Sequence, residues 1–220
     1  MTLRLDRDGA ALHAGAASAL LPELEALAAR QPQARAGVRL QGDAALSELL
    51  DRGPIHALAA SYLGAPARPV RAVLFDKSAG NNWSLGWHQD RTVAVRARRA
   101  VAGYGTWSRK QGILHVEPPF PVIERMVTLR LHLDAVPGHN APLLIAPGSH
   151  RLGRLPEAEI AAAVERCGTA TCLAAAGDVW AYATPILHAS AAAEGGGRRR
   201  VLQVDYAAGS LPGGLEWLGI

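Results

Sequence analysis

A histidine and an aspartate stand two residues apart in the sequence GWHQDRT, which spans residues 86–92. In an extended chain alternate side chains share a face, so His88 and Asp90 point the same way and Gln89 points opposite. A neutral imidazole and a carboxylate on one face supply two of the three ligands of the facial triad that binds Fe(II). Such a pair is also typical of ordinary surface polar residues, so the choice between a metal site and a polar surface depends on whether a third ligand exists elsewhere in the chain.

The best candidate for the third ligand is His188, which lies in the run GDVWAYATPILHAS at residues 177–190. This run has a strand-turn-strand pattern, which would carry His188 into the interior of a β-barrel. A single histidine in such a place is more often a hydrogen-bonded core residue than a metal ligand. The residues that accompany His188 therefore decide between the two interpretations.

An arginine follows eleven residues after His188, at Arg199 in the sequence GGGRRRVLQVDYA. The intervening AAAEGGG is a flexible connection that predicts a hairpin, which would bring Arg199 back beside the His188 strand. Strand parity places Arg199, Gln203 and Asp205 on one face. An arginine on an inward face requires an anion, and a carboxylate held by two hydrogen bonds is its strongest partner. The alternative is that all three arginines of residues 198–200 are solvated.

Short segments rich in β-forming residues follow one another from residue 69 onward, each bounded by Pro, Gly, Asn or Asp. They are PVRAVLFDK, ERMVTLRLHLD, PLLIAPG, DVWAYAT and RRVLQVDY. In the second segment Thr128, Arg130 and His132 share a face. We expect this face to point inward, because leucines occupy the opposite face and a polar stripe against an apolar layer would be costly.

The first 68 residues are predicted to be helical. The run ASALLPELEALAARQ has leucines at helical spacing, and Asp43 can cap the run GDAALSELLDRG. In GPIHALAASYLG, Pro54 stands in the first turn and Gly64 beyond the end, and one later helix is predicted in PEAEIAAAVERCG. Helices followed by short strands predict one mainly β (α+β) domain over residues 1–220, with a sandwich or barrel core at 69–207.

Residues 91–124 depart from this pattern, because they are rich in Arg, Gly and Pro and have only weak periodicity. Long segments of this kind in compact domains are commonly lids or binding loops. We expect a lid that presents Trp107, Arg109 and Lys110 to the site. A surface excursion packed on the helices is an equally supported alternative.

The composition is that of an ordinary globular protein, with 49% hydrophobic and 19% charged residues. No apolar run is long enough to cross a bilayer and the N-terminus lacks the order of a secretory signal, so a cytoplasmic location is expected. The net charge of +4 keeps nucleic-acid binding open, but no nucleic-acid-binding motif supports it. Cys167 and Cys172 predict buried free thiols.

Four segments together, WHQD, PGSHR, AGDVWAYATPILHAS and RRVLQVDYA, resemble the phytanoyl-CoA dioxygenase family of Fe(II)/2-oxoglutarate-dependent oxygenases. The resemblance runs in consistent order from about Val70 to Ala207. It implies a double-stranded β-helix, or jelly-roll, core of the cupin type. It also implies Fe(II), 2-oxoglutarate as cosubstrate, O2 and the hydroxylation or other oxidation of a small molecule.

The resemblance assigns His88, Asp90 and His188 as iron ligands. It assigns Arg199 to the distal carboxylate of 2-oxoglutarate, and Ser190 to a position where the family has a hydroxyl on the same carboxylate. Related halogenases lack the carboxylate ligand, so Asp90 favours hydroxylation or another oxidation over halogenation. After the sequence GHN the family usually has glycine where this chain has alanine at residue 141, a change that we expect to be harmless.

Residues close to these motifs are candidate contacts with the cosubstrate or the substrate. Lys77 and Arg130 are expected near the cosubstrate, the latter where family members often carry an aromatic residue. The remaining candidates suit the expected substrate, a carboxylate-bearing small molecule, although a tryptophan is as often core packing. These substrate candidates are Trp87, Asn82, Trp107, Arg109, Lys110 and His132.

Three other functions fit part of the pattern. Nucleic-acid dealkylation by the same iron chemistry would use the basic surface, but the position of Arg199 is closer to the small-molecule family. A non-catalytic, cupin-like binding protein would not need all three ligand types together with Arg199. A zinc hydrolase with a His/Asp/His site is chemically possible, but it leaves Arg199 without a role.

Overall fold

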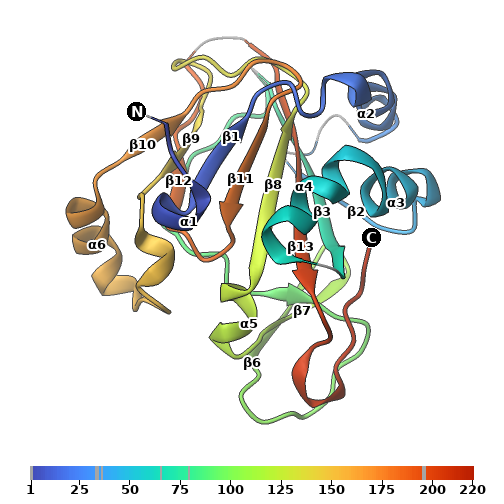
Figure 1. Cartoon of the computed structure of the whole chain (residues 1–220), viewed down its shortest axis with the longest axis vertical. Helices are drawn as coiled ribbons and strands as arrows, with labels where there is room; N and C mark the ends of the chain where they lie inside the picture. Colours follow the sequence, from blue (N-terminus) through green and yellow to red (C-terminus); the bar gives the residue numbers. More distant parts are fainter. Residues whose placement is uncertain (1, 33–34, 36, 65, 79, 195–196) are drawn as a thin grey trace.

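Two antiparallel β-sheets form the centre of the molecule, and a third, smaller sheet lies at one end (Figure 1). The computed structural model describes residues 2–220 except 33–34, 36, 65, 79 and 195–196. The six-stranded sheet has the order β1 (Ala10–His13), β11 (Val179–Ala183), β8 (Met126–His132), β13 (Arg199–Ala208), β3 (Ala67–Lys77) and β2 (Gly37–Leu40). The four-stranded sheet has the order β10 (Ala170–Cys172), β9 (Leu143–Ile145), β12 (His188–Ser190) and β4 (Leu85–His88). Two such antiparallel sheets with flanking helices are the predicted jelly-roll fold, which is confirmed.

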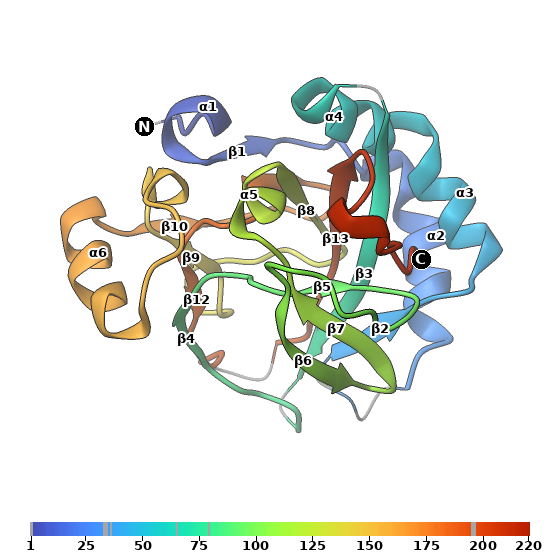
Figure 2. The same cartoon turned by 90° about the horizontal axis from the view of Figure 1, so that it is seen from below.

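The helices lie around these sheets, and most of them come early in the chain. They are α1 (Leu5–Asp8), α2 (Leu21–Ala29), α3 (Ala44–Asp51), α4 (Gly53–Leu63), α5 (Phe120–Glu124) and α6 (Ile160–Cys167). Figures 1 and 2 show α2, α3 and α4 grouped on one side of the molecule, with α6 on the opposite side. No helix among the described residues is long and apolar enough to span a membrane.

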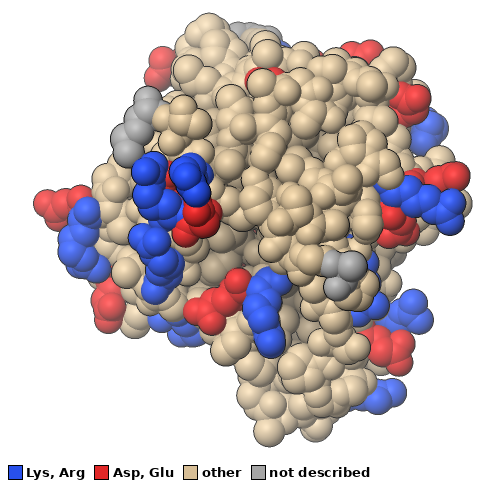
Figure 3. Space-filling model, viewed as in Figure 1, with Lys and Arg blue, Asp and Glu red and all other residues tan. Residues whose placement is uncertain are grey.

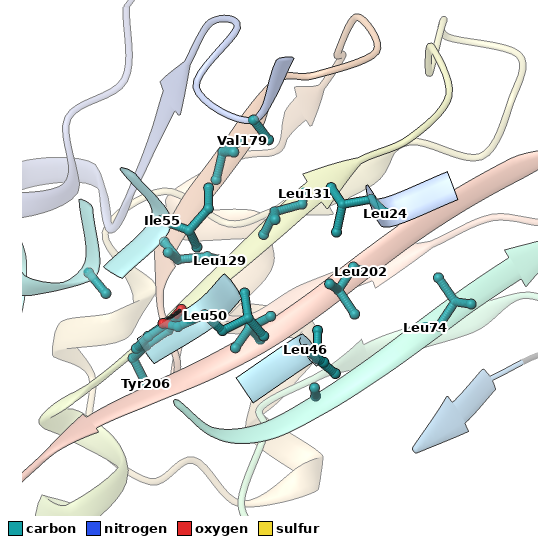
Figure 4. Packing of buried hydrophobic residues seen from close by; sticks show 14 of the residues in the cluster. Leu24, Leu46, Leu50, Ile55, Leu74, Leu129, Leu131, Val179, Leu202 and Tyr206 are labelled. Carbon is teal, nitrogen blue, oxygen red and sulfur yellow. Dashed lines mark hydrogen bonds between the residues drawn. The ribbon is translucent and has the colours of Figure 1, made fainter. Parts of the chain in front are cut away.

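The main hydrophobic core lies between the six-stranded sheet and the group of α2, α3 and α4 (Figure 4). Leu129 and Leu131 of β8 and Leu202 of β13 are completely buried there, against Leu50 of α3 and Ile55 of α4. Burying one such side chain stabilises the fold by roughly 1.5–3 kcal/mol. The apolar face of each strand is thus covered by helices, and its polar face is left to the space between the two sheets.

Local signals in the sequence account for the ends of these helices. The Asp43 carboxylate accepts hydrogen bonds from the backbone N–H groups of Ala45 and Leu46 at 3.1 Å, so it caps α3 as predicted. In α4, Pro54 stands in the first turn, where no helical hydrogen bond is lost. Gly64 ends that helix at φ +71°, a conformation that glycine adopts without strain.

Two strands in the first 68 residues, β1 and β2, accompany the predicted helices and form the two edges of the six-stranded sheet. Each has only four residues, which is too short for a clear alternation of apolar and polar residues. Both cysteines are free; Cys172 is buried as predicted and Cys167 is half-buried.

The segment 91–124 also has regular structure. It contains β5 (Val93–Ala94), β6 (Gly105–Lys110), β7 (Ile113–Glu117) and α5. These strands form the three-stranded sheet, and Val93, Val116 and Ile123 pack with Leu211 and Trp217 near the C-terminus in a small core of their own. The segment packs on the C-terminal residues rather than on the helices of the alternative interpretation. Whether the segment moves as a lid stays a prediction.

Candidate active site

The structure brings the three predicted ligands together at one point of the four-stranded sheet. His88 ends β4, His188 begins β12, and the two residues are direct partners across the antiparallel pair. Their ring centroids lie 4.2 Å apart, and ligand atoms of His88, Asp90 and His188 all lie within 4.8 Å of one another. That spacing fits three protein ligands on a single metal ion.

Hydrogen bonds orient both imidazoles for metal binding. His88 Nδ1 lies 2.8 Å from the carbonyl oxygen of Gly86, and His188 Nδ1 lies 3.0 Å from that of Ile186. A carbonyl only accepts, so each Nδ1 carries the proton and leaves Nε2 free as a ligand. Burial and the neighbouring His88 lower the pKa of His188 to about 4, which keeps its imidazole neutral at neutral pH.

The third candidate ligand, Asp90, is held by an arginine that sequence reasoning missed. Arg71 of β3 donates from Nη2 to Asp90 at 3.0 Å and from Nε to Asp205 of β13 at 2.5 Å. Thr128 donates to the other oxygen of Asp205 at 3.0 Å. Burial opposes the ionisation of Asp90, but Arg71 and the two histidines outweigh it, so the pKa of Asp90 lies below its usual value.

A cavity of about 380 Å³ opens between the two large sheets next to the three ligands. Its lining on the six-stranded sheet includes Arg130, Arg199 and Gln203, and on the four-stranded sheet Leu143 and Ser190. The predicted parity of β8 and β13 therefore holds, because their polar residues face this space and their leucines face the helices. A pocket of this size suits a small molecule.

Arg199 has the environment of an anion-binding residue. Its side chain is buried and donates from Nη1 to the carbonyl of Ala141, and its Nε has no hydrogen-bond partner among the described residues. Burial and the nearby Arg130 lower its pKa to about 9. The two neighbouring arginines differ from it, because Arg198 pairs with Asp76 at 2.7 Å and Arg200 with Asp134 at 2.6 Å.

Arg199 crosses to the site from the opposite sheet, which corrects the predicted hairpin. Its strand β13 pairs with β3 and β8, whereas the His188 strand β12 pairs with β4 and β9. The connection changes sheets because β12 already has hydrogen-bonded partners on both edges. Residues 195–196 of the predicted flexible connection lie outside the described residues.

Two other residues expected at the cosubstrate lie beside Arg199. Lys77 is buried and donates from Nζ to the Trp83 carbonyl at 2.6 Å, to the Ala191 carbonyl at 2.8 Å and to Ser190 Oγ at 3.3 Å. Burial, followed by the charges of Arg199 and Arg130, lowers the pKa of Lys77 to about 8. Lys77 therefore orients Ser190 from behind the cavity wall, of which Ser190 itself is part.

Arg130 and His132 share a strand face but have different surroundings. Arg130 lines the cavity, donates from Nη1 to Gln203 at 2.8 Å and lies 5.4 Å from the centre of the Phe75 ring. His132 is buried and is not part of the cavity lining. Burial lowers its pKa to about 3, so its imidazole is neutral.

Of the other substrate candidates, Lys110 lines the cavity and four do not. Trp87 and Arg109 are sequence neighbours of His88 and Lys110 in their strands, so their side chains point to the opposite faces. Trp107 lies under the guanidinium of Arg98 within the small core of the insertion. The fourth is Asn82, whose side-chain amide donates to the Ala193 carbonyl and accepts from the Ala193 backbone N–H.

Residues of β2 and β3 complete the lining and were missed by sequence reasoning. They are Arg39 on β2 and Arg71, Val73 and Phe75 on β3. The alternation of residues 71, 73 and 75 in PVRAVLFDK is a signal for one inward face, and a charged residue in the middle of a buried strand marks that face as polar. Arg39 gave no such signal, because β2 was not predicted.

Comparison with known proteins agrees with the fold. The crystal structure of AviO1 from Streptomyces viridochromogenes Tue57 matches with a TM-score of 0.62 and 23% identity over 95% of this chain and 94% of that chain. EctD from S. alaskensis, solved as apoform and with bound Fe, matches as apoform with a TM-score of 0.69 and 18% identity over 98% and 78%. HygX from Streptomyces hygroscopicus, solved with nickel and 2-oxoglutarate, matches with a TM-score of 0.63 and 14% identity over 93% and 84%.

The sequence comparison is more specific than these structural matches, which show the fold alone. A search of curated proteins gave no match. The family model described as phytanoyl-CoA dioxygenase (PhyH), however, matches residues 11–201, which include all three candidate metal ligands and Arg199. The chain therefore belongs to the phytanoyl-CoA dioxygenase family.

Proposed function

We propose that this protein is an Fe(II)- and 2-oxoglutarate-dependent oxygenase that hydroxylates a small molecule and releases succinate and CO2. The observation that carries the proposal is the cavity that joins the three ligand side chains to Arg199, a buried arginine without a carboxylate partner in the described chain. Membership in a dioxygenase family supports the same activity.

The donor set fits Fe(II), because two imidazoles and one carboxylate on one side of an ion leave the remaining positions open. When bound there, iron would supply the oxidative chemistry together with 2-oxoglutarate and O2. His88, Asp90 and His188 would hold it, and Arg71 fixes the Asp90 carboxylate through its hydrogen bond. The hydrogen bond from Arg71 restricts rotation of the Asp90 carboxylate and so holds it in one orientation for metal binding.

The opposite wall of the cavity suits the distal carboxylate of 2-oxoglutarate. Arg199 offers an Nε–H without a partner in the described residues, and Ser190 offers a hydroxyl held by Lys77. A carboxylate would satisfy the buried guanidinium, whose charge is otherwise costly in this setting. Hydroxylation is our choice among oxidations because Asp90 fills the ligand position that related halogenases leave open.

Nucleic-acid dealkylation finds no support on the face seen in Figure 3. Among the residues described there, Lys and Arg side chains are interspersed with Asp and Glu and form no continuous basic surface. A small cavity between two sheets also suits a small molecule better than an extended polyanion.

The proposal is tested by measuring Fe(II)-dependent conversion of 2-oxoglutarate to succinate by the purified protein. Wild type is expected to form succinate slowly even without a substrate, and His88→Ala is expected to lose this activity. His139→Ala is the matched control, because His139 is exposed and lies outside the cavity, and it should keep wild-type activity. Binding of 2-oxoglutarate without any succinate would instead indicate a non-catalytic binding protein.

A further inference from the structure

The cavity is lined by more positive charge than metal and cosubstrate binding require. One acidic side chain, Asp90, stands among the lining residues that the structure describes. Five basic side chains accompany it: Arg39, Arg71, Lys110, Arg130 and Arg199. Two of these, Arg130 and Arg199, form the wall proposed for 2-oxoglutarate, and the other three gather on the Asp90 side.

Two of the five basic side chains, Arg71 and Arg199, have an anionic partner once metal and cosubstrate are in place. Arg130 donates to the neutral Gln203 beside Arg199, and Arg39 and Lys110 stand apart from that wall. Arg71 is neutralised by Asp205 at 2.5 Å. Asp90 and one carboxylate of 2-oxoglutarate would balance a divalent metal, and the other carboxylate would balance Arg199. Arg39 and Lys110 form no ion pair among the described residues, and the nearby Asp90 is already taken up by Arg71 and the metal. Both side chains are partly buried, where an unpaired charge is unfavourable.

The contacts of both side chains leave hydrogen-bond donors available. Arg39 Nε is buried and has no hydrogen-bond partner in the described part of the chain, and Lys110 Nζ donates to Thr92 Oγ1 at 3.2 Å. Burial and then the charge of Arg71 lower the pKa of each group, and the charge of Asp90, which raises both pKa values, does not offset them. A bound anion would relieve this repulsion.

Gln111 fixes the two basic residues next to each other, although they come from distant segments. Its side chain accepts from the backbone N–H of Arg39 at 3.0 Å and donates to the Gly37 carbonyl at 2.6 Å. These bonds dock the turn between β6 and β7 on the outer edge of β2. Lys110, the residue before Gln111, is thereby held at the cavity beside Arg39.

We propose that Arg39 and Lys110 form a subsite that binds an anionic group of the substrate, a carboxylate or a phosphate, beside the metal. This assignment rests on the proposed function, because it places the anion in the same cavity as the oxidation. Val73, Phe75 and Leu85 line that cavity as well and offer apolar surface to the rest of the substrate. The substrate is then a small anion with an apolar part.

The test is calorimetric titration of the anaerobic protein, loaded with Fe(II) and 2-oxoglutarate, with three probes that share a phenyl ring. Benzoate carries the carboxylate, phenyl phosphate the phosphate, and benzamide is the neutral control. We expect one of the two anions to bind more tightly than benzamide, and the tighter one identifies the group. Arg39→Gln and Lys110→Gln should each weaken its binding roughly tenfold, which corresponds to one charge-assisted hydrogen bond.

Arg109→Gln is the matched control, since Arg109 is exposed on the same strand and donates to the Gly112 carbonyl outside the cavity. It should leave anion binding unchanged. Equal affinity for benzamide and both anions, or unaltered anion binding in Arg39→Gln and Lys110→Gln, would overturn the subsite. The visible absorption of the Fe(II)–2-oxoglutarate complex, recorded on the same samples, reports the proposed function separately, because neither variant changes a residue assigned to metal or cosubstrate.

Discussion

Replacing Arg71 with methionine should destabilise the protein severely, because it leaves a buried carboxylate without its counterion. The Arg71 and Asp205 side chains are 11% and 3% exposed, and their Nε–O distance is 2.5 Å. Breaking a buried pair by removing one partner costs about 3–5 kcal/mol, whereas a surface pair contributes about 0–1 kcal/mol. Methionine keeps the length of the aliphatic side chain, so most of the loss comes from the charges left on Asp205 and, in the absence of metal, on Asp90.

The assay is urea denaturation in the presence of a chelator, so that metal binding does not contribute to the free energy of unfolding. Arg154→Met is the control, since Arg154 pairs with Glu117 at 2.7 Å but is 49% exposed, and it should cost at most about 1 kcal/mol. Adding Asp205→Asn to Arg71→Met should restore part of the stability, because the uncompensated charge is then removed. Equal losses in Arg71→Met and Arg154→Met would refute the reasoning.

Three further predictions concern single positions. Arg199→Met should raise the 2-oxoglutarate concentration for half-maximal succinate formation roughly tenfold or more. Arg198→Met should leave that concentration unchanged, because Arg198 pairs with Asp76, and equal effects of the two variants would refute the assignment of Arg199. Ala141→Gly should raise the midpoint of thermal unfolding, because alanine is strained at its φ of +50° and glycine is not. The relief exceeds the entropy that glycine loses on folding by up to about 1 kcal/mol, and a lower midpoint would contradict this. Asp43→Ala should cost about 1 kcal/mol in urea denaturation by removing the cap of α3, and no loss would contradict the capping.

The candidate metal centre could be predicted from the sequence because its geometry is local. His88 and Asp90 share a strand face by parity alone, and His188 follows a strand-turn-strand pattern that the structure contains as β11 and β12. The alternation of side chains along β8 also placed Arg130 on the face opposite its leucine neighbours. These inferences need no knowledge of which strands are neighbours.

The rest of the site depends on strand neighbours, which a single sequence does not specify. Arg71 reaches Asp205 because β3 lies next to β13, and it reaches Asp90, which follows β4 of the other sheet, across the space between the two large sheets. Arg39 enters the cavity because β2 adds to the edge of β3. Residues 108–110 pair regularly with β7, but the weak periodicity of the insertion predicted no strand there, so parity could not be used to separate Lys110 from Arg109.

The most direct test of the central claim is anaerobic addition of Fe(II) and then 2-oxoglutarate to the purified protein, followed by visible spectroscopy. Chelation of Fe(II) by the 2-oxo acid gives a weak charge-transfer band. The account predicts this band in wild type at one iron per chain, and its loss in His188→Ala with the fold retained. Absence of the band in wild type, or a band that persists unchanged in His188→Ala, would contradict a single iron held by His88, Asp90 and His188.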